Sequence, residues 1–309
     1  MQNARGGLPA VLGLVVGAVG CGGPTIDKER AAQLFSEVPV DTANGLSGLA
    51  ADSGGALWTV SERGHRAYRI QLDASLAPKV ESFEVRGVPD GTDLEGIAVL
   101  DGEEVPQRFA FGTEGQDDGK ATVLVAKRQE QVITVEQAID LPASAVGIDL
   151  KQNQGAEGVC GTGNVLFAAI EGAGVDLRKR WAPVVRIVDG QVAQLYRVWL
   201  TSDVGKLSGL DCRVSSDGSA SVMAIERHFA VTKVLRFWLP ATAPGAIPQD
   251  ITPEVALDLS EVLRSGLNLE GVAWTAGGQV AAVVDNEWTS VTGPNELVVF
   301  KPGVLAPPR

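Results

Sequence analysis

Acidic residues recur at matching positions in five similar segments of this 309-residue chain, and carboxylates are side chains that hard cations prefer. Each segment opens with a phrase such as DLEGIAV or NLEGVAW, in which a Glu or Ser and then a Gly start an apolar run. A second apolar run follows a turn rich in Gly, Asp or Ser and ends in an acid. We call the Glu or Ser the anchor and the closing residue the second acid. The anchors are Ser47, Glu95, Glu157, Ser208 and Glu270, and the second acids are Glu62, Glu114, Glu171, Glu226 and Asp285.

Gathering eight carboxylates in one place is costly, because two like charges ~5 Å apart repel by roughly 3 kcal/mol at an effective dielectric near 20. Protonation, Arg or Lys partners, backbone N–H donors or a metal ion could each relieve that cost. Ca²⁺ fits best, since it takes oxygen ligands, and no His or Cys cluster indicates zinc. We therefore expect the eight acids to be calcium ligands. Two structural alternatives stay open: anchors that bond to the backbone of the next repeat, and second acids that pair with Arg63 or Arg227.

Cationic side chains follow the second acid in the two repeats whose anchor is Ser. The first reads SERGH and supplies Arg63 and His65, and the second reads IERH and supplies Arg227 and His228. Arg and His beside a metal would suit a phosphorylated or carboxylated ligand. We therefore expect these four residues to bind a small anionic substrate. The alternative for the histidines is that they are loop-tip residues.

The elements that must position these side chains are short strands in repeated groups of four. In each repeat the anchor opens a first strand and the second acid closes an antiparallel second strand, so both lie at one end of the hairpin. Third and outer strands follow, and four short antiparallel strands repeated in this way are typical of a β-propeller blade. Residues 34–40 would supply the outer strand that the last repeat lacks. We predict an all-β fold, one propeller of about five four-stranded blades, with six as the alternative.

In a propeller the first strand of each blade lines the central channel, so the anchors and second acids should surround one mouth of it. The Gly after each anchor would let the backbone of one repeat approach another closely.

The composition is globular, with 45% hydrophobic residues and 37 Gly, which favours many turns over long helices. A net charge of −12 argues against nucleic acid as a partner. The sequence contains neither a P-loop nor a dinucleotide fingerprint, and GLSGL does not match the G-x-S-x-G nucleophile motif.

The N-terminus is typical of an export signal, because Arg5 precedes a short apolar run that ends in small residues before Cys21. The text AVGC resembles a bacterial lipobox, in which the Cys is acylated. We expect a signal peptide over residues 1–20, a tether over 21–33 and a single domain over 34–309, in a protein anchored by lipid to the bacterial cell envelope. Plain secretion is the alternative.

Export also bears on Cys160 and Cys212, which follow two successive anchors. Equivalent strands of adjacent repeats usually lie beyond the ~7 Å Cα separation that a disulfide allows. We therefore expect two buried thiols, with a bridge as the alternative.

The quoted phrases together resemble the phytase-like propeller proteins labelled "esterase-like activity of phytase". The segments that show the resemblance are GLSGLAADSGGALWTVSERG, DLEGIAVL with FAFGTEG, GAEGVCGTGNVLFAAIEG and NLEGVAW. The resemblance covers roughly residues 46–300. The resemblance implies a propeller, export and calcium-assisted hydrolysis of phosphoesters or esters, with the eight acids at the matching positions. This chain lacks the dense acidic loops and the lysine-rich phosphate site of true propeller phytases. Two other functions remain open: a noncatalytic propeller that binds a ligand or an envelope protein, and a lactonase-like propeller with one metal deep in the channel.

Overall fold

Short alternating or apolar runs separated by Gly-rich turns form strands throughout the chain, as their β-branched and aromatic content favours. The computed structural model describes residues 26–306 except 44, 63, 116–118, 152, 242–246, 264–266, 276 and 287–294. Three short helices accompany the strands in this part of the chain: α1 (Lys28–Leu34), α2 (Ala143–Val146) and α3 (Ser260–Leu263). None of the described helices is long and apolar enough to cross a membrane.

The strands follow one another in antiparallel meanders, and each meander begins with one of the repeated phrases. The first strands are β2 (Leu46–Ala51), β6 (Asp93–Val99), β10 (Ala156–Thr162), β15 (Lys206–Val214) and β20 (Asn268–Trp274). The second strands are β3 (Leu57–Ser61), β7 (Arg108–Glu114), β11 (Val165–Ile170), β16 (Ala220–His228) and β21 (Val280–Asp285). The third strands are β4 (Arg66–Leu72), β8 (Lys120–Gln129), β13 (Lys179–Val188), β17 (Val231–Leu239) and β22 (Glu296–Phe300). The outer strands are β5 (Pro78–Arg86), β9 (Val132–Pro142), β14 (Gln191–Trp199), β19 (Glu254–Asp258) and β1 (Phe35–Pro39).

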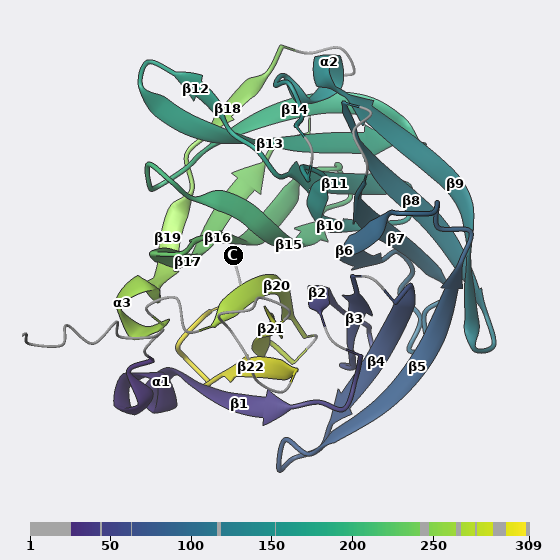
Figure 1. Cartoon of the computed structure of the whole chain (residues 1–309), viewed down its shortest axis with the longest axis vertical. Coiled ribbons are helices and arrows are strands. Elements are labelled where there is room, and N and C mark those ends of the chain that lie inside the picture. The colour runs from purple at the N-terminus through teal and green to yellow at the C-terminus, as the bar shows by residue number, and fades with distance from the viewer. Residues whose placement is uncertain are drawn as a thin grey trace, which may run out of the picture.

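The first strands form a closed ring around the middle of the molecule (Figure 1). β2 contacts β6 and β20, β10 contacts β6 and β15, and β15 contacts β20. The meanders radiate from this ring, which is the arrangement of a β-propeller. The predicted all-β propeller is therefore the observed architecture.

The ring is tight because glycine follows each anchor. A Cβ on Gly158 would lie 2.6 Å from the amide nitrogen of Leu210 in the next first strand. A Cβ on Gly271 would lie 2.4 Å from the backbone of Gly48, where the last repeat meets the first. No side chain fits at such distances, so these positions require Gly, as the sequence predicted.

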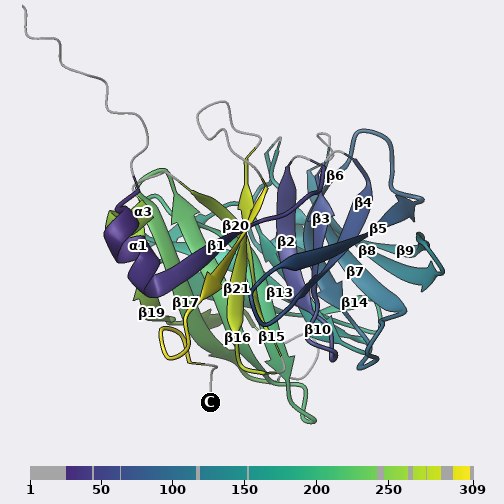
Figure 2. The same ribbon diagram turned by 90° about the horizontal axis from the view of Figure 1, so that it is seen from below.

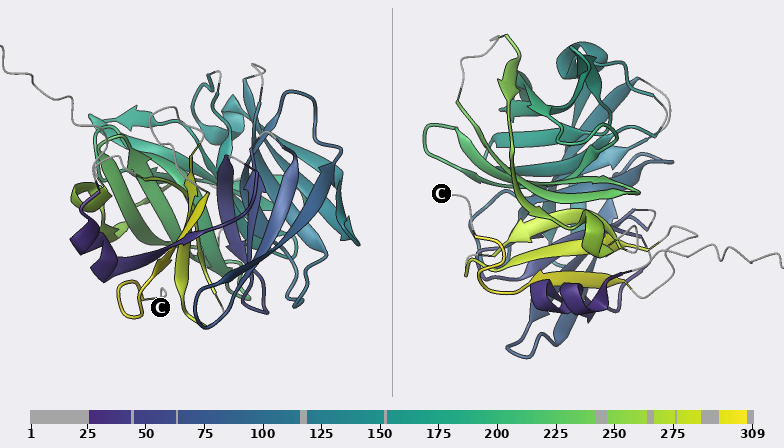
Figure 3. Two further views of the ribbon diagram at one scale, coloured as in Figure 1. Left: turned by 60° about the horizontal axis from the view of Figure 1, so that its bottom comes forward. Right: turned by 90° about the vertical axis from the view of Figure 1, so that its left-hand side faces the viewer.

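The N-terminal segment completes the last sheet. β1 pairs antiparallel with β22, with Phe35 opposite Phe300, so the predicted closing strand is confirmed. Figure 3 shows the purple N-terminal strand beside the yellow C-terminal strands. This pairing ties the two ends of the propeller together and covers an exposed sheet edge.

Two parallel pairings were not predicted. β5 pairs with β9, which joins the first two meanders at their outer edges into one eight-stranded sheet. The short strand β18 (Gln249–Ile251), which follows the fourth meander's third strand, pairs with β14 of the third meander. Both pairings cover outer edges. A further short strand, β12 (Gly174–Asp176), pairs with the start of β13.

Apolar side chains fill the spaces between neighbouring meanders. Each of the hydrophobic clusters in the described chain draws on two adjacent meanders, including one that joins the last meander to the first. Between the first two meanders, the fully buried Trp58 packs against Phe83 and Phe109, with ring centroids 5.0 and 4.8 Å away. Burial of such a side chain stabilises the fold by about 3 kcal/mol.

Cys160 and Cys212 form a disulfide, and the expectation of two buried thiols was wrong. Their Cα atoms lie 5.6 Å apart on β10 and β15. The expectation assumed the ordinary separation of strands in adjacent repeats. Gly158 brings the two first strands closer than that, which places the cysteines within bridging distance.

Part of the expected tether is folded. Asp27 caps α1 by accepting a hydrogen bond from the Arg30 amide, and its own amide donates to Val262 at 2.8 Å. Ala31 is buried against the last two meanders. Figure 2 shows α1 beside α3. Residues 28–33 therefore belong to the folded domain. The predicted signal peptide and Cys21 lie outside the described residues.

Candidate metal centre

A β-bulge aims four of the five anchor side chains. In those hairpins the pairing register skips the anchor, for example between Ala156 and Gly158 and between Leu269 and Gly271. In the first hairpin the anchor Ser47 pairs with Val60, and the register shifts just after it. A bulge leaves one residue without a partner and turns its side chain. The anchors are buried, with exposed fractions between 0% and 6%.

The second acids close the neighbouring strands at the same end of each hairpin. Glu114 lies opposite Asp93, Glu226 opposite Leu207 and Asp285 opposite Asn268 in the antiparallel registers. Glu62 and Glu171 directly follow β3 and β11. All the anchors and second acids therefore occupy the same end of their hairpins, which is one mouth of the channel.

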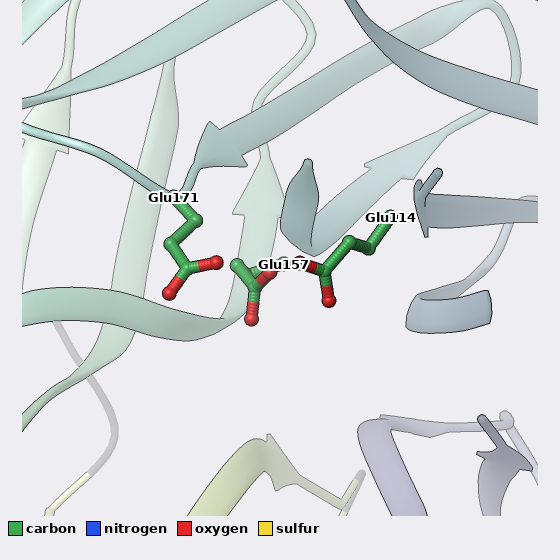
Figure 4. Close-up of side chains that lie close together, drawn as sticks. All are labelled: Glu114, Glu157 and Glu171. Carbon is green, nitrogen blue, oxygen red and sulfur yellow. The ribbon is translucent and has the colours of Figure 1, made fainter. Parts of the chain in front are cut away.

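Three glutamates converge at this mouth. One carboxylate oxygen from each of Glu114, Glu157 and Glu171 lies within 4.8 Å of the other two. Figure 4 shows the Glu157 carboxylate between those of its two neighbours. Two oxygens on opposite sides of a calcium ion are separated by about 5 Å, since each Ca–O distance is about 2.3–2.6 Å. The existing spacing therefore fits a calcium ion.

Glu157 supplies a second observation that points to a ligand. Its side chain is 4% exposed, and its Oε1 atom is buried without a hydrogen-bond partner. A buried unpaired carboxylate oxygen is costly, typically by about 1–3 kcal/mol or more. A cation between the three glutamates would satisfy this oxygen.

The electrostatics of the mouth reflect the crowding of like charges. Burial raises the pKa of Glu95 well above its usual range, and the charges of Glu157, Glu62, Glu114 and Glu270 add to the rise. Burial also raises the pKa of Glu114 to about 7, with Glu157 contributing and Lys206 opposing. Carboxylates from four different meanders therefore influence one another.

The two Ser anchors bond to the next repeat. The Ser47 hydroxyl donates to Glu95 Oε2 at 3.0 Å, and the Ser208 hydroxyl donates to the Leu269 carbonyl at 3.2 Å. The Ser208 contact matches the structural alternative for the anchors, a bond to the backbone of the next repeat, whereas Ser47 bonds a side chain. The Oε1 atom of Glu157 differs, because it has no such partner among the described residues.

Arg227 forms an ion pair with an anchor. Its Nε donates to Glu270 Oε2 at 2.9 Å, and its guanidinium also bonds Oε1, which accepts a further bond from Asn268. Burial lowers the pKa of Arg227, but the carboxylates of Glu270, Glu157 and Asp285 raise it, and the net shift is upward. Burial also raises the pKa of Glu270 to about 7, which would favour the neutral acid. Three N–H donors on one carboxylate favour the charged pair.

Lys206 forms a further ion pair at the mouth. Its ammonium donates to Glu171 Oε1, within the group of three glutamates. Lys206 was not among the predicted site residues. The available signal was the basic residue two positions before the Ser anchor in KLSGL.

The remaining predicted residues that the structure describes contact other parts of the protein. Glu226 is fully buried, and its oxygens accept four hydrogen bonds from the amides and hydroxyls of Thr201 and Ser202. Asp285 accepts a bond from Asn268 at 2.9 Å. The His65 ring bonds the Thr92 carbonyl at 2.8 Å, and the exposed His228 packs edge-on against Phe229. Arg63 lies outside the described residues.

A separate cavity of about 230 Å³ lies at the other ends of the first strands. Its lining includes the Cys160–Cys212 bridge, Asp52, Asp211 and Trp274. Burial raises the pKa of Asp211 to about 7, although the amides of Trp274 and Cys212 donate to its carboxylate. This cavity holds no group of converging carboxylates among the described residues, so it does not compete with the mouth as a cation site.

A family model described as "Phytase-like: Esterase-like activity of phytase" matches residues 41–288. No curated protein matches the chain. Among solved structures, the PQQ-bound aldose sugar dehydrogenase of Streptomyces coelicolor is 14% identical, with a TM-score of 0.46 over 86% of this chain and 98% of that one. An oxidoreductase of Thermus thermophilus, described as a glucose dehydrogenase, is 11% identical, with a TM-score of 0.47 over 86% and 100%. Virginiamycin B lyase from Staphylococcus aureus is 9% identical, with a TM-score of 0.42 over 86% and 98%. Likenesses this distant carry no conclusion about the reaction of this chain.

Proposed function

The chain belongs to the phytase-like family described by the esterase-like activity of phytase, and on that premise we propose that it is a calcium-assisted hydrolase of phosphoester or ester bonds. The site is the mouth of the channel. Glu114, Glu157 and Glu171 would hold the ion. The observation that supports this most directly is the buried Glu157 carboxylate, which lies between two further carboxylates and has an unpartnered Oε1.

When bound, a calcium ion supplies Lewis-acid chemistry to an ester or phosphoryl oxygen. The protein residues would differ in their roles around it. Glu114, Glu157 and Glu171 hold the ion. Glu95 and Glu270 would form an outer layer of carboxyl groups around it, with Ser47 and Arg227 fixing their orientation. Glu62 and Asp285 lie at the same end of their hairpins, whereas the oxygens of Glu226 already accept four hydrogen bonds.

A small anionic substrate would approach from the rim. Arg227 brings positive charge beside the glutamates, and His65 and His228 stand at the mouth end of the same two repeats that the sequence singled out. We include Arg63 with them because it adjoins Glu62 in the sequence. The net charge of −12 makes nucleic acid an unsuitable substrate.

We also propose a blade count of five. The support is the ring of first strands, in which the glycine of each repeat abuts the next and Gly271 returns to Gly48. The last blade would consist of β20, β21, β22 and β1.

We further propose that the protein is exported and held to the bacterial envelope through lipid on Cys21, as the AVGC text indicates. Radiolabelled palmitate should enter the wild-type protein but not a Cys21→Ser variant. Equal labelling of both would contradict the anchor.

Turnover of p-nitrophenyl phosphate and p-nitrophenyl acetate, measured with calcium and with a chelator, tests the proposed reaction. We expect hydrolysis only with calcium, and a loss of at least about 100-fold in Glu157→Gln. The control is Glu136→Gln, an exposed residue of β9, which should retain full activity. Calcium binding without turnover of either substrate would favour the noncatalytic binding propeller. Turnover restricted to lactones would favour the lactonase-like alternative.

A further inference from the structure

Lys206 shares a carboxylate with the candidate metal centre. It opens β15 directly after Gly205, and its ammonium bonds Oε1 of Glu171, one of the three converging glutamates. The Lys206 charge also opposes the raised pKa of Glu114, so its influence extends across the group. In the structure, therefore, a cation of the chain itself already neutralises part of this acidic group.

A calcium ion and an ammonium compete for such a group. Both are attracted to Glu171, and they repel each other when they share it, because little water separates charges at a partly buried site. The Lys206 and Glu171 side chains are only 26% and 15% exposed. Binding of a divalent ion must therefore overcome the resident positive charge.

From this geometry we propose that Lys206 is a built-in competitor of the metal: it neutralises Glu171 in the metal-free protein and releases it when calcium binds. The lysine would thereby set the calcium concentration at which the site fills. This inference rests on the proposed cation site, and it adds the residue that regulates its occupancy.

Lys206 can leave its partner without disturbing the ring. A lysine has a flexible four-carbon stem and a single point of charge, so it can swing aside while its backbone stays paired. Its neighbours Asp203 and Val204 are exposed, which leaves solvent close to the strand start. Arg227 on the adjacent strand differs, because two of its N–H groups bond Glu270 together and fix it in place.

Calcium titration by isothermal calorimetry tests this proposal with the full folded domain. Lys206→Gln should bind calcium about tenfold more tightly than the wild type, because the competing charge is gone. Lys206→Arg keeps the charge and should not tighten binding. Lys79→Gln removes the same charge from the far end of β5, where Lys79 is 77% exposed, and should match the wild type. Glu157→Gln should lose the titration signal, which assigns that signal to the mouth.

A separate readout is the melting temperature in chelator. Lys206→Gln should melt several degrees below the wild type without calcium, because Glu171 loses its partner, and should recover when calcium is added. A purely structural lysine would lower the melting temperature and leave the calcium affinity unchanged.

The outcomes distinguish this inference from the proposed function. If the wild type binds calcium and Lys206→Gln binds no more tightly, the competitor role is wrong while the metal site stands. If only Lys206→Gln binds calcium, the competitor role holds and the calcium-assisted reaction of the wild type fails. If neither protein binds calcium, both proposals are wrong.

Discussion

The hydroxyl of Ser47 donates a hydrogen bond to Glu95 Oε2 at 3.0 Å, although the two residues lie 48 positions apart in the chain. Both are anchors, so equivalent residues of successive repeats touch directly at the channel mouth. The contact satisfies one oxygen of a carboxyl whose pKa is raised by burial and by four neighbouring acids. The arrangement of the repeats thus brings together more acidic residues than any single repeat contains.

This crowding makes the stability of the metal-free protein depend on pH. Glu95 and Glu114 keep their protons in the folded protein at pH values where the unfolded chain has lost them, since both pKa values are raised from 4.5. The contribution of Glu114 is fully present below about pH 4.5 and is lost as pH rises through about 7, and the raised pKa of Glu95 gives a loss in the same direction as pH rises. In chelator we expect the melting temperature to be about 5 °C lower at pH 8 than at pH 5.

Calcium bound at the mouth should remove most of this pH dependence, because it screens the carboxylates. Asp211 at the separate cavity adds a decrease in stability with rising pH, since burial also raises its pKa. A melting temperature in chelator that rises between pH 5 and pH 8 would contradict the account.

Replacing Glu157 by Gln should stabilise the metal-free protein. The change removes a negative charge beside Glu95 and Glu114 while preserving the shape of the side chain. Relief of about 1 kcal/mol would raise the melting temperature by about 2–4 °C. Differential scanning calorimetry in chelator measures this, with Glu136→Gln as the exposed control. A destabilised Glu157→Gln protein would show that this carboxylate is structural.

Glu226 should matter for stability and not for calcium. Its side chain is fully buried, and Glu226→Ala would leave the amides and hydroxyls of Thr201 and Ser202 without their acceptor. We expect a loss of about 3 kcal/mol or more in the free energy of urea unfolding. Glu254→Ala, at a side chain that is 71% exposed and pairs with Arg236, should change it by less than about 0.5 kcal/mol. Loss of calcium binding in Glu226→Ala protein that is still folded would place Glu226 in the metal centre instead.

The Cys160–Cys212 bridge should stabilise the ring. It closes a sequence separation of 52 residues, for which the loss of unfolded-chain entropy corresponds to about 4 kcal/mol. A Cys160→Ala/Cys212→Ala protein should unfold at correspondingly lower urea concentration, and dithiothreitol should affect only the wild type. An unchanged midpoint in both comparisons would show that the bridge contributes nothing.

The architecture could be predicted from the sequence because the repeats share the same order of residue types. The anchor followed by Gly marks each first strand, and the shortage of an outer strand after residues 296–300 points to residues 34–40. The prediction for the two cysteines failed because it depended on the distance between two neighbouring strands. Gly158 was identified as a site of close approach, yet the ordinary strand spacing was still assumed for Cys160 and Cys212.

The site could be predicted in part. The shared end of the hairpins follows from strand direction, so the mouth position of Glu114, Glu157 and Glu171 was foreseeable. The bulges at the anchors were not, because a bulge leaves no residue pattern beyond the Gly. The partners of Arg227 and Glu226 depend on side-chain paths between repeats, which spacing along the chain does not encode.

Long-wavelength anomalous diffraction from a crystal soaked in calcium would show whether the three glutamates bind the ion. We expect a calcium peak bounded by the carboxylates of Glu114, Glu157 and Glu171, with Oε1 of Glu157 among the ligands. A mouth without a peak at saturating calcium, with Lys206 still bonded to Glu171, would contradict it.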